Sequence, residues 1–410
     1  MPEVDQLLPE RAPVDADALV RQLRQAQREL RPFHPEVVAF AGELARRLRR
    51  LPTVRDHPAL GALAFWIRPT SVERLRAEWD AGARPGRARV PRGVAFHIPP
   101  TNVDTLFVYS WLLSALVGNA NVVRLSRAAA DAGGPLLEVL ADVVAAHPLV
   151  ARTTAVVTYG HEEPVTAALS RADVRVIWGG DDTVAAVRAV PLAPHATELA
   201  FPDRFSLVLL DAPAVAALDD GALGELAGRF YNDAYWFDQM GCASPRAVVW
   251  RGGERDATAA QQRWFDALAA VVEAKGYDVA TGAVLAKLTH ASDVASHGAL
   301  AGLDWRRNPV TVGTVRRLGE LPRDSPGGGL FYTARVERLE ELAEVVQRRD
   351  QTLTTYGFDE AELTALAVAL NGRGIDRIVP VGEALSFDHL WDGVDLLAAF
   401  SRLVVVKVAP

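Results

Sequence analysis

A helix, a turn and the approach to a strand follow one another in Phe230-Tyr-Asn-Asp-Ala-Tyr-Trp-Phe-Asp-Gln-Met-Gly-Cys-Ala-Ser-Pro245, and this stretch holds the only cysteine among 410 residues. The aromatic residues are typical of one side of a helix, and an apolar strand is predicted at Ala247–Trp250. A thiol at such a junction can face a cleft where backbone N–H groups lower its pKa and hold a developing oxyanion. A lone cysteine is, however, more often a small buried hydrophobic residue. Cys242 is therefore a candidate nucleophile that needs support from the rest of the chain.

Composition excludes several classes of protein. Half of the residues are hydrophobic and 23% are charged, as in ordinary globular proteins, and the length predicts two or three domains. The net charge of −7 argues against nucleic acid or an anionic membrane as the main partner. A single cysteine fits a reducing compartment, the polar N-terminus is unlike a signal peptide, and the longest apolar run, Leu106–Val117, is too short to span a bilayer. We therefore expect a soluble, cytoplasmic protein without a membrane span.

Strands and helices alternate after a helical N-terminal region at residues 15–80 and a Gly/Pro/Arg-rich loop or edge hairpin at 82–92. This order predicts a parallel α/β sheet that binds ligands at the carboxyl ends of its strands. No G-x-G-x-x-G motif occurs there, so a dinucleotide would have to be held in another way. Strands are predicted at 93–98, 121–125, 154–158 and 174–178, and helices at 106–117, 135–146, 161–170 and 180–190.

A second α/β unit begins with the strand predicted at 205–210 and carries Cys242. The apolar pattern at 403–408 predicts a strand near the end of the sequence. Such a strand must pair with another, for which a second subunit is one candidate. Further predicted elements are helices at 257–275 and 336–348, a glycine run at 327–329 and a strand at 351–355.

Four elements, in this order, resemble the aldehyde dehydrogenase superfamily, and more closely its acyl-CoA reductase branch, the LuxC family. Three further stretches are also similar to that branch, and the resemblance extends from about residue 35 to the end. The four elements are Phe96-His-Ile-Pro-Pro-Thr-Asn102, Gly118-Asn-Ala-Asn-Val-Val-Arg124, Val176-Ile-Trp-Gly-Gly-Asp181 and Asp238-Gln-Met-Gly-Cys-Ala-Ser-Pro245. The further stretches are Ala64–Arg68, Gly374–Ala384 and Trp391–Gly393.

The resemblance implies that Cys242 is the catalytic thiol. Its thiolate would attack an acyl thioester, release CoA or a carrier thiol, and form an acyl-enzyme that accepts hydride and collapses to an aldehyde. The side-chain amide of Asn102 and the backbone N–H of Cys242 would stabilise the oxyanion. Taken without the family, Asn102 is also a suitable helix N-cap.

The resemblance also implies a cofactor site. Arg124 occupies the position of a lysine that contacts the adenosine ribose in aldehyde dehydrogenases, and an arginine can bind a 2′-phosphate through two N–H groups, so NADPH is the expected cofactor. By itself, Arg124 is also typical of a surface arginine that ends a strand. Gly180 and Asp181 match a Gly-Ser pair whose helix N-terminus meets a cofactor phosphate. Asp181 is unfavourable beside a phosphate unless it turns away, and its alternative function is an N-cap. Neighbouring residues assigned to the cofactor site are Pro99, Pro100 and Gly179.

Two departures from the family concern carboxylates. Glu198 does not align cleanly with the glutamate that activates water in aldehyde dehydrogenases, although it stays a candidate site residue. The segment Ser325–Leu330 lacks the glutamate that usually holds the nicotinamide ribose. Its glycines permit close backbone approach to a ligand, or they form a flexible turn. Residues assigned to the substrate or nicotinamide vicinity are Gln239, Gly241, Gly328, Gly329 and Glu198.

His97 lies within an apolar strand, which favours a core histidine over a catalytic base.

We therefore expect an aldehyde dehydrogenase-like α/β fold. The expected domains are a helical N-terminus with a Rossmann-like NADPH-binding domain at 1–203, an α/β catalytic domain at 204–385, and a C-terminal segment at 386–410 with an oligomerisation strand. A second oligomerisation element is expected at 82–95, and the assembly is expected to be a homodimer or homotetramer.

The expected reaction is NADPH-dependent reduction of an acyl thioester, carried by CoA or an acyl carrier protein, to an aldehyde. An acyl-activating enzyme is a candidate partner, and no metal site, nucleic acid or membrane span is expected. The alternatives are an aldehyde-oxidising dehydrogenase, a cysteine acyltransferase or thioesterase that binds no nucleotide, and a non-catalytic scaffold protein.

Overall fold

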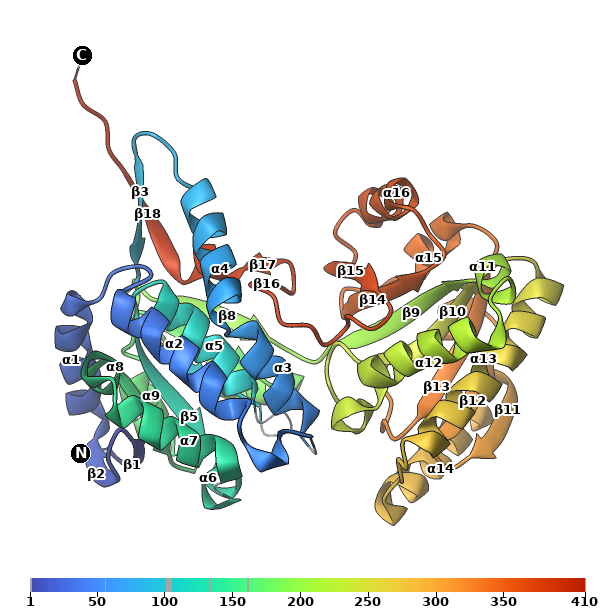
Figure 1. The fold of residues 1–410 in the computed structure, drawn as a ribbon, viewed down its shortest axis with the longest axis horizontal. Coiled ribbons are helices and arrows are strands. Elements are labelled where there is room, and N and C mark those ends of the chain that lie inside the picture. The colour runs from blue at the N-terminus through green and yellow to red at the C-terminus, as the bar shows by residue number, and fades with distance from the viewer. Residues whose placement is uncertain (1, 56, 101–104, 133, 161, 410) are drawn as a thin grey trace. The chain divides into compact units, whose positions relative to one another are not determined.

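The computed structural model describes residues 2–55, 57–100, 105–132, 134–160 and 162–409. The chain forms two compact units, Met1–Pro202 with Phe387–Pro410, and Asp203–Ser386. Each unit contains one seven-stranded sheet (Figure 1). The sequence predicts a separate C-terminal segment at 386–410. In the structure, the residues after Ser386 belong to the first unit.

The first unit begins with a β-hairpin that the sequence pattern did not predict, since its strands are short and show no clear alternation. Its strands are β1 (Glu3–Leu8), β2 (Ala12–Asp15), β3 (Arg87–Pro91), β4 (Val94–Ile98), β5 (Ala120–Leu125), β6 (Thr154–Thr158), β7 (Val174–Trp178), β8 (Thr197–Phe201), β16 (Leu390–Trp391), β17 (Val394–Asp395) and β18 (Ser401–Val405). Its helices are α1 (Ala16–Ala26), α2 (Pro35–Leu48), α3 (Pro58–Trp66), α4 (Pro69–Ala81), α5 (Leu106–Leu116), α6 (Arg127–Ala132), α7 (Gly134–Ala145), α8 (Pro148–Thr153), α9 (Glu163–Leu169), α10 (Asp181–Arg188) and α17 (Leu396–Ala399).

The large sheet of the first unit has the order β2-β1-β6-β5-β4-β7-β8, and its strands β4 to β8 are parallel. Its interior strand β4 (Val94–Ile98) is buried at every position, as expected for a parallel strand covered on both faces. On one face, α1 and α9 contribute apolar side chains to the core. The helix α5 contacts β4 and β5 and is itself buried along its whole length. The longest apolar run of the sequence therefore forms a core helix.

Sequence pattern explains the amphipathic helix α2. Pro35 occupies its first turn, where no backbone donor is needed, and apolar side chains recur every three or four residues. These buried residues are Val37, Phe40, Ala41, Leu44, Ala45 and Leu48.

The second unit has the sheet order β11-β12-β13-β10-β9-β14-β15, in which only the edge pair β11–β12 is antiparallel. Its strands are β9 (Phe205–Asp211), β10 (Pro245–Arg251), β11 (Leu300–Arg307), β12 (Val310–Val315), β13 (Leu330–Val336), β14 (Asp350–Tyr356) and β15 (Arg377–Pro380). Its helices are α11 (Ala212–Ala216), α12 (Asp220–Ala234), α13 (Glu254–Ala274), α14 (Thr281–Ser296), α15 (Leu339–Val345) and α16 (Glu360–Leu370), and a 3₁₀ turn spans Trp236–Gln239. The helix predicted at 336–348 is shorter than expected, because β13 continues to Val336.

Two apolar cores lie on the two faces of this second sheet. One contains residues of α11, α12 and α13, including Trp264 and Phe230. The other contains residues of α15 and α16. Alternate residues of the central strands β9 and β10 enter the two cores, so both faces of these parallel strands are covered.

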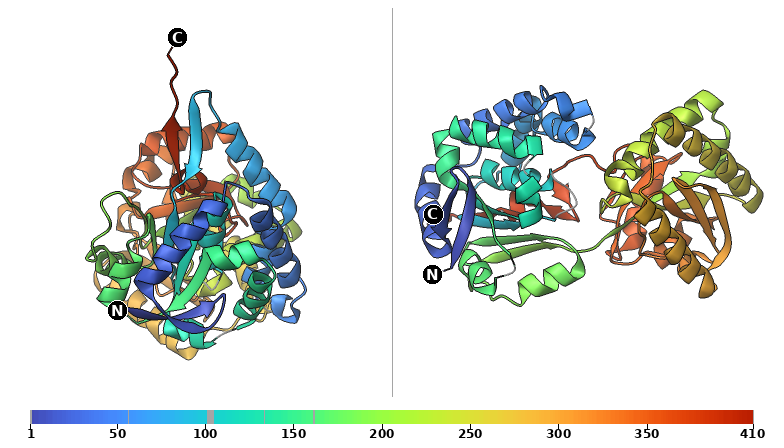
Figure 2. Two further views of the ribbon diagram at one scale, coloured as in Figure 1. Left: turned by 90° about the vertical axis from the view of Figure 1, so that its left-hand side faces the viewer. Right: turned by 90° about the horizontal axis from the view of Figure 1, so that it is seen from below.

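The strand predicted near the end of the sequence pairs within the chain. β18 and β3 form a separate antiparallel ribbon, with Ser401 opposite Pro91 and Val405 opposite Arg87 (Figure 1 and the left view of Figure 2). Leu403 and Val405 remain more than half exposed on this ribbon. In the part of the chain that is described, no helix combines the length and apolar character needed to cross a membrane.

Candidate active site

The order of strands in the first unit identifies a ligand-binding edge. β5 and β6 lie on one side of β4, whereas β7 and β8 lie on the other, so the strand order reverses between β4 and β7. Ligands of open α/β sheets bind outside the carboxyl ends of the strands at such a switch point. Pro99 and Pro100 directly follow β4, and Gly179 and Gly180 directly follow β7. Four residues predicted for the cofactor site are thus placed at the two sides of the switch point.

The first turn of α10 also follows β7. Gly180 is the N-cap residue, in extended conformation, and Asp181 is the first residue of the helix. The alternative in which Asp181 serves as N-cap is therefore wrong. Asp181 and Asp182 both lie in the first helical turn, where acidic side chains interact favourably with the helix dipole.

Arg124 lies near the carboxyl end of β5 and contacts the loop that follows β6. Its Nη2 donates to the carbonyl oxygen of Gly160 at 2.9 Å, and its guanidinium carbon lies 5.0 Å from the centre of the Tyr159 ring. Its Nε is buried and has no hydrogen-bond partner among the described residues. A buried donor without a partner is costly, so this atom is available for an acceptor that the described residues do not supply.

The predicted oxyanion donor Asn102 lies outside the described residues, together with Thr101, Val103 and Asp104. The helix that follows is α5, which begins at Leu106. The placement of the Asn102 amide therefore stays a prediction.

Glu198 forms ion pairs with two arginines of the first unit. Its carboxylate lies 2.6 Å from Nη2 of Arg175 and 2.7 Å from Nε of Arg188. Burial raises the pKa of Glu198, but the hydrogen bonds from Arg188 and Arg175 outweigh burial and lower the pKa below its ordinary value. A carboxylate held in this way is a poor acceptor for a proton from water, which weighs against a catalytic base at this position.

His97 is a core histidine, as the sequence favoured. Its side chain is fully buried, and its ring nitrogens lie 2.8 Å from Oγ of Ser110 and 3.0 Å from Oδ1 of Asn121. Burial lowers the pKa of His97 to about 4, so the ring is neutral at physiological pH.

In the second unit, Cys242 lies in a tight turn just before β10. The backbone N–H of Ser244 donates to the carbonyl oxygen of Gly241 at 3.0 Å and closes the turn. The hydroxyl of Ser206, on β9, donates to the carbonyl oxygen of Cys242 at 2.8 Å and accepts the backbone N–H of Thr352, on β14, at 3.2 Å. The half-buried Cys242 is thus fixed through its own backbone to the amino ends of two neighbouring strands.

The residues before this turn have an uncommon backbone conformation. Phe237, Asp238 and Gln239 have positive φ angles of 55°, 53° and 65°. Each non-glycine residue in the left-handed region costs roughly 1–3 kcal/mol and persists only where surrounding contacts impose it, which is common at functional sites. Three such residues in succession therefore point to a segment that the rest of the unit holds in place.

The side chain of Gln239 supplies part of that support. It is fully buried, and its amide nitrogen donates to the carbonyl oxygens of Pro245 at 2.9 Å and Leu330 at 3.1 Å. Its amide oxygen accepts the backbone N–H of Gly329 at 2.9 Å. Gln239 therefore connects the segment before the cysteine to the starts of β10 and β13.

The glycine run Gly327–Gly329 packs against the same segment. All three glycines have positive φ angles, and Gly328 donates its backbone N–H to the carbonyl oxygen of Asp238 at 2.9 Å. A Cβ atom on Gly327 would lie 2.5 Å from the carbonyl oxygen of Asp238, and one on Gly329 would lie 1.8 Å from that of Pro309. The close approach that these glycines permit is thus to the protein's own backbone. The alternative of a flexible turn does not fit these contacts.

Arg246 was not predicted from the sequence, although a cation four residues after the only cysteine was a usable signal. Its Nε donates to the carbonyl oxygen of Gln239 at 3.3 Å, across the base of the turn that contains Cys242. Burial lowers the pKa of Arg246, and repulsion from Arg349 lowers it further. Attraction to Cys242 and Asp203 raises it. A positive charge therefore lies within electrostatic reach of the thiol.

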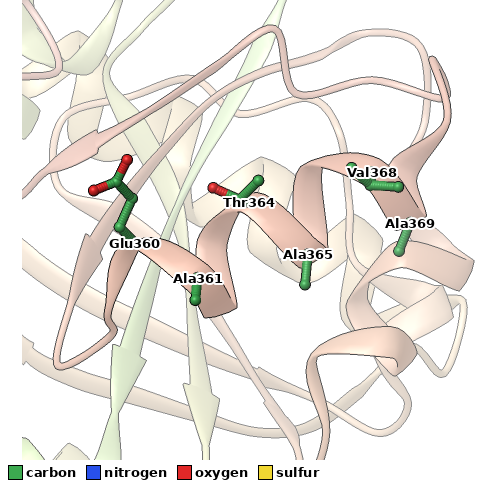
Figure 3. Close-up of a pocket in the computed structure, with 6 residues that line it drawn as sticks. All are labelled: Glu360, Ala361, Thr364, Ala365, Val368 and Ala369. Atoms are coloured by element: carbon green, nitrogen blue, oxygen red, sulfur yellow. The ribbon is translucent and has the colours of Figure 1, made fainter.

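A hollow also lies along one exposed face of α16. Figure 3 shows the small side chains of Ala361, Ala365 and Ala369 on this face. Its other lining residues are Glu360, Thr364 and Val368. None of the predicted site residues lines this hollow, so we do not include it in the candidate site.

Comparison with known proteins identifies relatives of this chain. The family model for acyl-CoA reductase (LuxC) matches residues 73–274. A long-chain acyl-protein thioester reductase 2 of Photobacterium leiognathi is 29% identical over 171 residues, which are 41% of this chain and 34% of the relative. A long-chain acyl-protein thioester reductase of Vibrio harveyi is 31% identical over 166 residues, which are 40% of this chain and 33% of the relative. The aligned part thus covers about a third of each curated relative.

Solved structures show the fold over almost the whole chain. A 1-pyrroline-5-carboxylate dehydrogenase of Thermus thermophilus has a TM-score of 0.66 at 16% identity and covers 95% of this chain and 85% of its own. An NAD-dependent benzaldehyde dehydrogenase of Corynebacterium glutamicum has a TM-score of 0.63 at 15% identity and covers 96% of this chain and 89% of its own. The expected aldehyde dehydrogenase-like fold and the resemblance to LuxC are confirmed.

Proposed function

From its relation to the LuxC acyl-CoA reductases and its aldehyde dehydrogenase fold, we propose that this protein reduces an acyl thioester to an aldehyde through an acyl group bound to Cys242. The observation that carries this proposal is the construction around the thiol. The turn of Cys242 is fixed by Ser206, the left-handed segment before it is held by Gln239, and the guanidinium of Arg246 lies within electrostatic reach. A thiol whose turn is fixed by several hydrogen bonds and a strained backbone segment is typical of a nucleophile rather than of a core residue.

The proposed chemistry begins with the Cys242 thiolate. It attacks the carbonyl carbon of the acyl thioester, the bond from that carbon to the carrier sulfur breaks, and the carrier leaves as a thiol that takes up a proton. A nicotinamide cofactor supplies a hydride to the carbonyl carbon when it is bound. The resulting thiohemiacetal releases the aldehyde and returns Cys242 as a thiolate, and the backbone N–H of Cys242 with the Asn102 amide is proposed to stabilise the oxyanions.

The first unit contains residues that fit a nicotinamide dinucleotide. Its proposed place is the switch point between β4 and β7, where Pro99 and Pro100 follow one strand and Gly179 and Gly180 follow the other. The buried Nε of Arg124 has no acceptor among the described residues, and a 2′-phosphate would supply one. We therefore propose NADPH as the preferred cofactor.

A substitution tests this cofactor preference. Replacing Arg124 with Leu removes a charge-assisted contact worth about 1.5–3 kcal/mol, so the KM for NADPH should rise by roughly 10- to 150-fold. The KM for NADH should change much less, because NADH carries no 2′-phosphate. Equal effects on both cofactors, or none on either, would exclude Arg124 as the phosphate ligand. Arg152, which is exposed and pairs with Glu29, is the matched control position.

The relatives' names indicate an acyl group carried on a protein, and we propose either acyl-CoA or an acyl carrier protein as the substrate, with an acyl-activating enzyme as a candidate partner. The ion pairs of Glu198 count against aldehyde oxidation, in which a base must activate water.

We further propose a homodimer or homotetramer that uses the β3–β18 ribbon with its exposed Leu403 and Val405. Cytoplasmic location stays a prediction from the single cysteine.

The function is tested by following NADPH absorbance with acyl-CoAs of graded chain length and with an acyl carrier protein, for the natural chain beside Cys242→Ala. We expect oxidation that depends on the acyl chain and is lost in the variant. Acyl transfer to water or another thiol without NADPH oxidation would support the acyltransferase or thioesterase alternative. NADPH oxidation that persists in Cys242→Ala would exclude the proposed acyl-enzyme.

A further inference from the structure

The loop Val381–Ser386 of the second unit is held from one side by a buried carboxylate. Asp233 lies near the end of α12, and its side chain is 1% exposed. One oxygen accepts the backbone N–H of Gly382 at 2.6 Å, and the other accepts that of Ala384 at 2.9 Å. Both carboxylate oxygens are therefore committed to the backbone of this loop.

The opposite polar groups of the same loop are held by a guanidinium. Arg377, at the start of β15, donates to the carbonyl oxygens of Ala384 at 2.7 Å, Glu383 at 3.0 Å and Ser386 at 3.0 Å. Two N–H groups of the loop thus donate to a carboxylate, and three of its carbonyl oxygens accept from a guanidinium. Charge-assisted hydrogen bonds of this kind are stronger than neutral ones, so the conformation of the loop is well determined.

The loop carries an apolar side chain to the residue before the cysteine. A Cβ atom on Gly241 would lie 3.4 Å from Cδ2 of Leu385, which is van der Waals contact. Leu385 itself is only half-buried, so part of its surface faces solvent beside the turn. Leu385 therefore places an apolar side chain against the residue that precedes Cys242 in the turn.

We propose that Leu385 forms a wall that limits the bulk of the acyl groups reaching Cys242, and that Asp233 is the positioning residue that holds this wall in place. The identification of the entering group as an acyl chain rests on the proposed function. The contact between Leu385 and Gly241, and the hydrogen bonds of Asp233 to the loop, do not depend on it.

The hold of Asp233 on the loop varies with pH. Burial raises the pKa of Asp233 to about 7, while the hydrogen bonds from Gly382 and Ala384 and the charge of Arg377 oppose this rise. The other facing charge is Glu383 of the loop, and the side chain of Arg229 on α12 lies against Gly382. A protonated carboxyl presents an O–H toward one of the two N–H donors, so the loop is held best above this pKa.

The test uses alkylation of Cys242, the only thiol in the chain, by iodoacetamide and by the bulkier N-benzyl iodoacetamide. Both reagents react with the thiolate, so the ratio of their rate constants cancels the thiolate fraction. Leu385→Ala should raise the ratio of the bulky to the small reagent by about fivefold or more, since a few methyl groups in a pocket are worth this much. Asp233→Asn should raise the ratio in the same direction.

The natural chain provides a measurement that needs no variant. Its ratio should rise as the pH falls through about 7, whereas the ratio of Asp233→Asn should stay constant across that range. Leu285→Ala and Asp293→Asn, both at exposed positions of α14, are the matched controls and should leave the ratio unchanged.

An unchanged ratio in Leu385→Ala would overturn the wall, and a natural-type, pH-dependent ratio in Asp233→Asn would overturn the positioning residue. Alkylation reports only on access to the thiol, so it separates this inference from the proposed reaction. Altered ratios in a protein that reduces no acyl thioester would support the wall and contradict the proposed function. Reductase activity with unaltered ratios would do the reverse.

Discussion

The backbone N–H of Gly329 donates to the side-chain amide oxygen of Gln239 at 2.9 Å, and this bond joins the glycine run to the segment before the cysteine. The same amide donates to carbonyl oxygens at the starts of β10 and β13. Two stretches with left-handed backbone are thus held together by one buried side chain. The position of Cys242 depends on this arrangement.

Replacing Gln239 with Ala should destabilise the second unit strongly. The substitution leaves a buried N–H and two buried carbonyl oxygens without this partner, and each unsatisfied group costs about 1–3 kcal/mol. Urea unfolding followed by fluorescence measures the loss. Gln347→Ala, at an exposed position of the same unit, should change the unfolding free energy by no more than about 0.5 kcal/mol. Equal stability of the two variants would show that Gln239 does not support the segment.

A matched pair of glycines separates backbone strain from close packing. Gly329 and Gly298 have nearly the same φ, 79° and 77°, but a Cβ atom on Gly329 would lie 1.8 Å from the carbonyl oxygen of Pro309, whereas one on Gly298 would meet no atom within 4 Å. Gly298→Ala should cost about 1–2 kcal/mol from conformation alone. Gly329→Ala should cost considerably more and should also slow alkylation of Cys242. Similar losses of Tm in the two variants would contradict the packing argument.

The charge of Arg246 should favour the thiolate of Cys242. Replacing it with Gln should move the pH profile of iodoacetamide alkylation to higher pH, because a nearby opposite charge stabilises the ionised form. Arg246→Lys should restore part of this effect, which a purely structural role of the side chain would not explain. Arg255→Gln, at an exposed position of α13, is the control. A profile that stays in place in Arg246→Gln would remove Arg246 from the site.

Asp233 should make stability depend on pH in a particular direction. Its pKa is raised from 3.8 to about 7 in the folded protein by burial, so the folded state binds more protons than the unfolded state between these values. The free energy of unfolding should therefore fall as pH rises from about 4 to about 7, by up to about 1.4 kcal/mol per pH unit, and level off above. Urea unfolding of the natural chain and Asp233→Asn over this range measures the difference. The unfolding free energy of the natural chain minus that of Asp233→Asn should fall with rising pH. A rise of this difference with pH would contradict the raised pKa of Asp233.

Sequence pattern was sufficient for part of each sheet and for His97. Alternation of buried strands with helices predicts parallel α/β units, and the predicted strands lie close to β4, β5, β6, β7 and β14. The neutral, buried state of His97 follows from its place in a run of apolar residues. These features depend on local periodicity, which the sequence displays directly.

The contacts around the thiol could not be predicted in the same way. Asp233 and Leu385 are about 150 residues apart in sequence, and the hydrogen bond from Ala384 to Asp233 joins Asp233 to the loop that carries Leu385. The glycine run suggested approach to a ligand, because sequence does not reveal that Pro309 and Asp238 occupy that space. Such long-range contacts depend on the tertiary fold, and no periodic signal reports them.

The most direct test of the central claim follows one acyl group on the full chain. The protein is incubated with an acyl thioester in the absence of nucleotide, its intact mass is recorded, and NADPH is then added. We predict one acyl adduct, mapped to Cys242 and absent in Cys242→Ala, that disappears on addition of NADPH with release of an equal amount of aldehyde. An adduct that also forms in Cys242→Ala, or one that NADPH and NADH both leave to hydrolyse to the acid, would contradict the account.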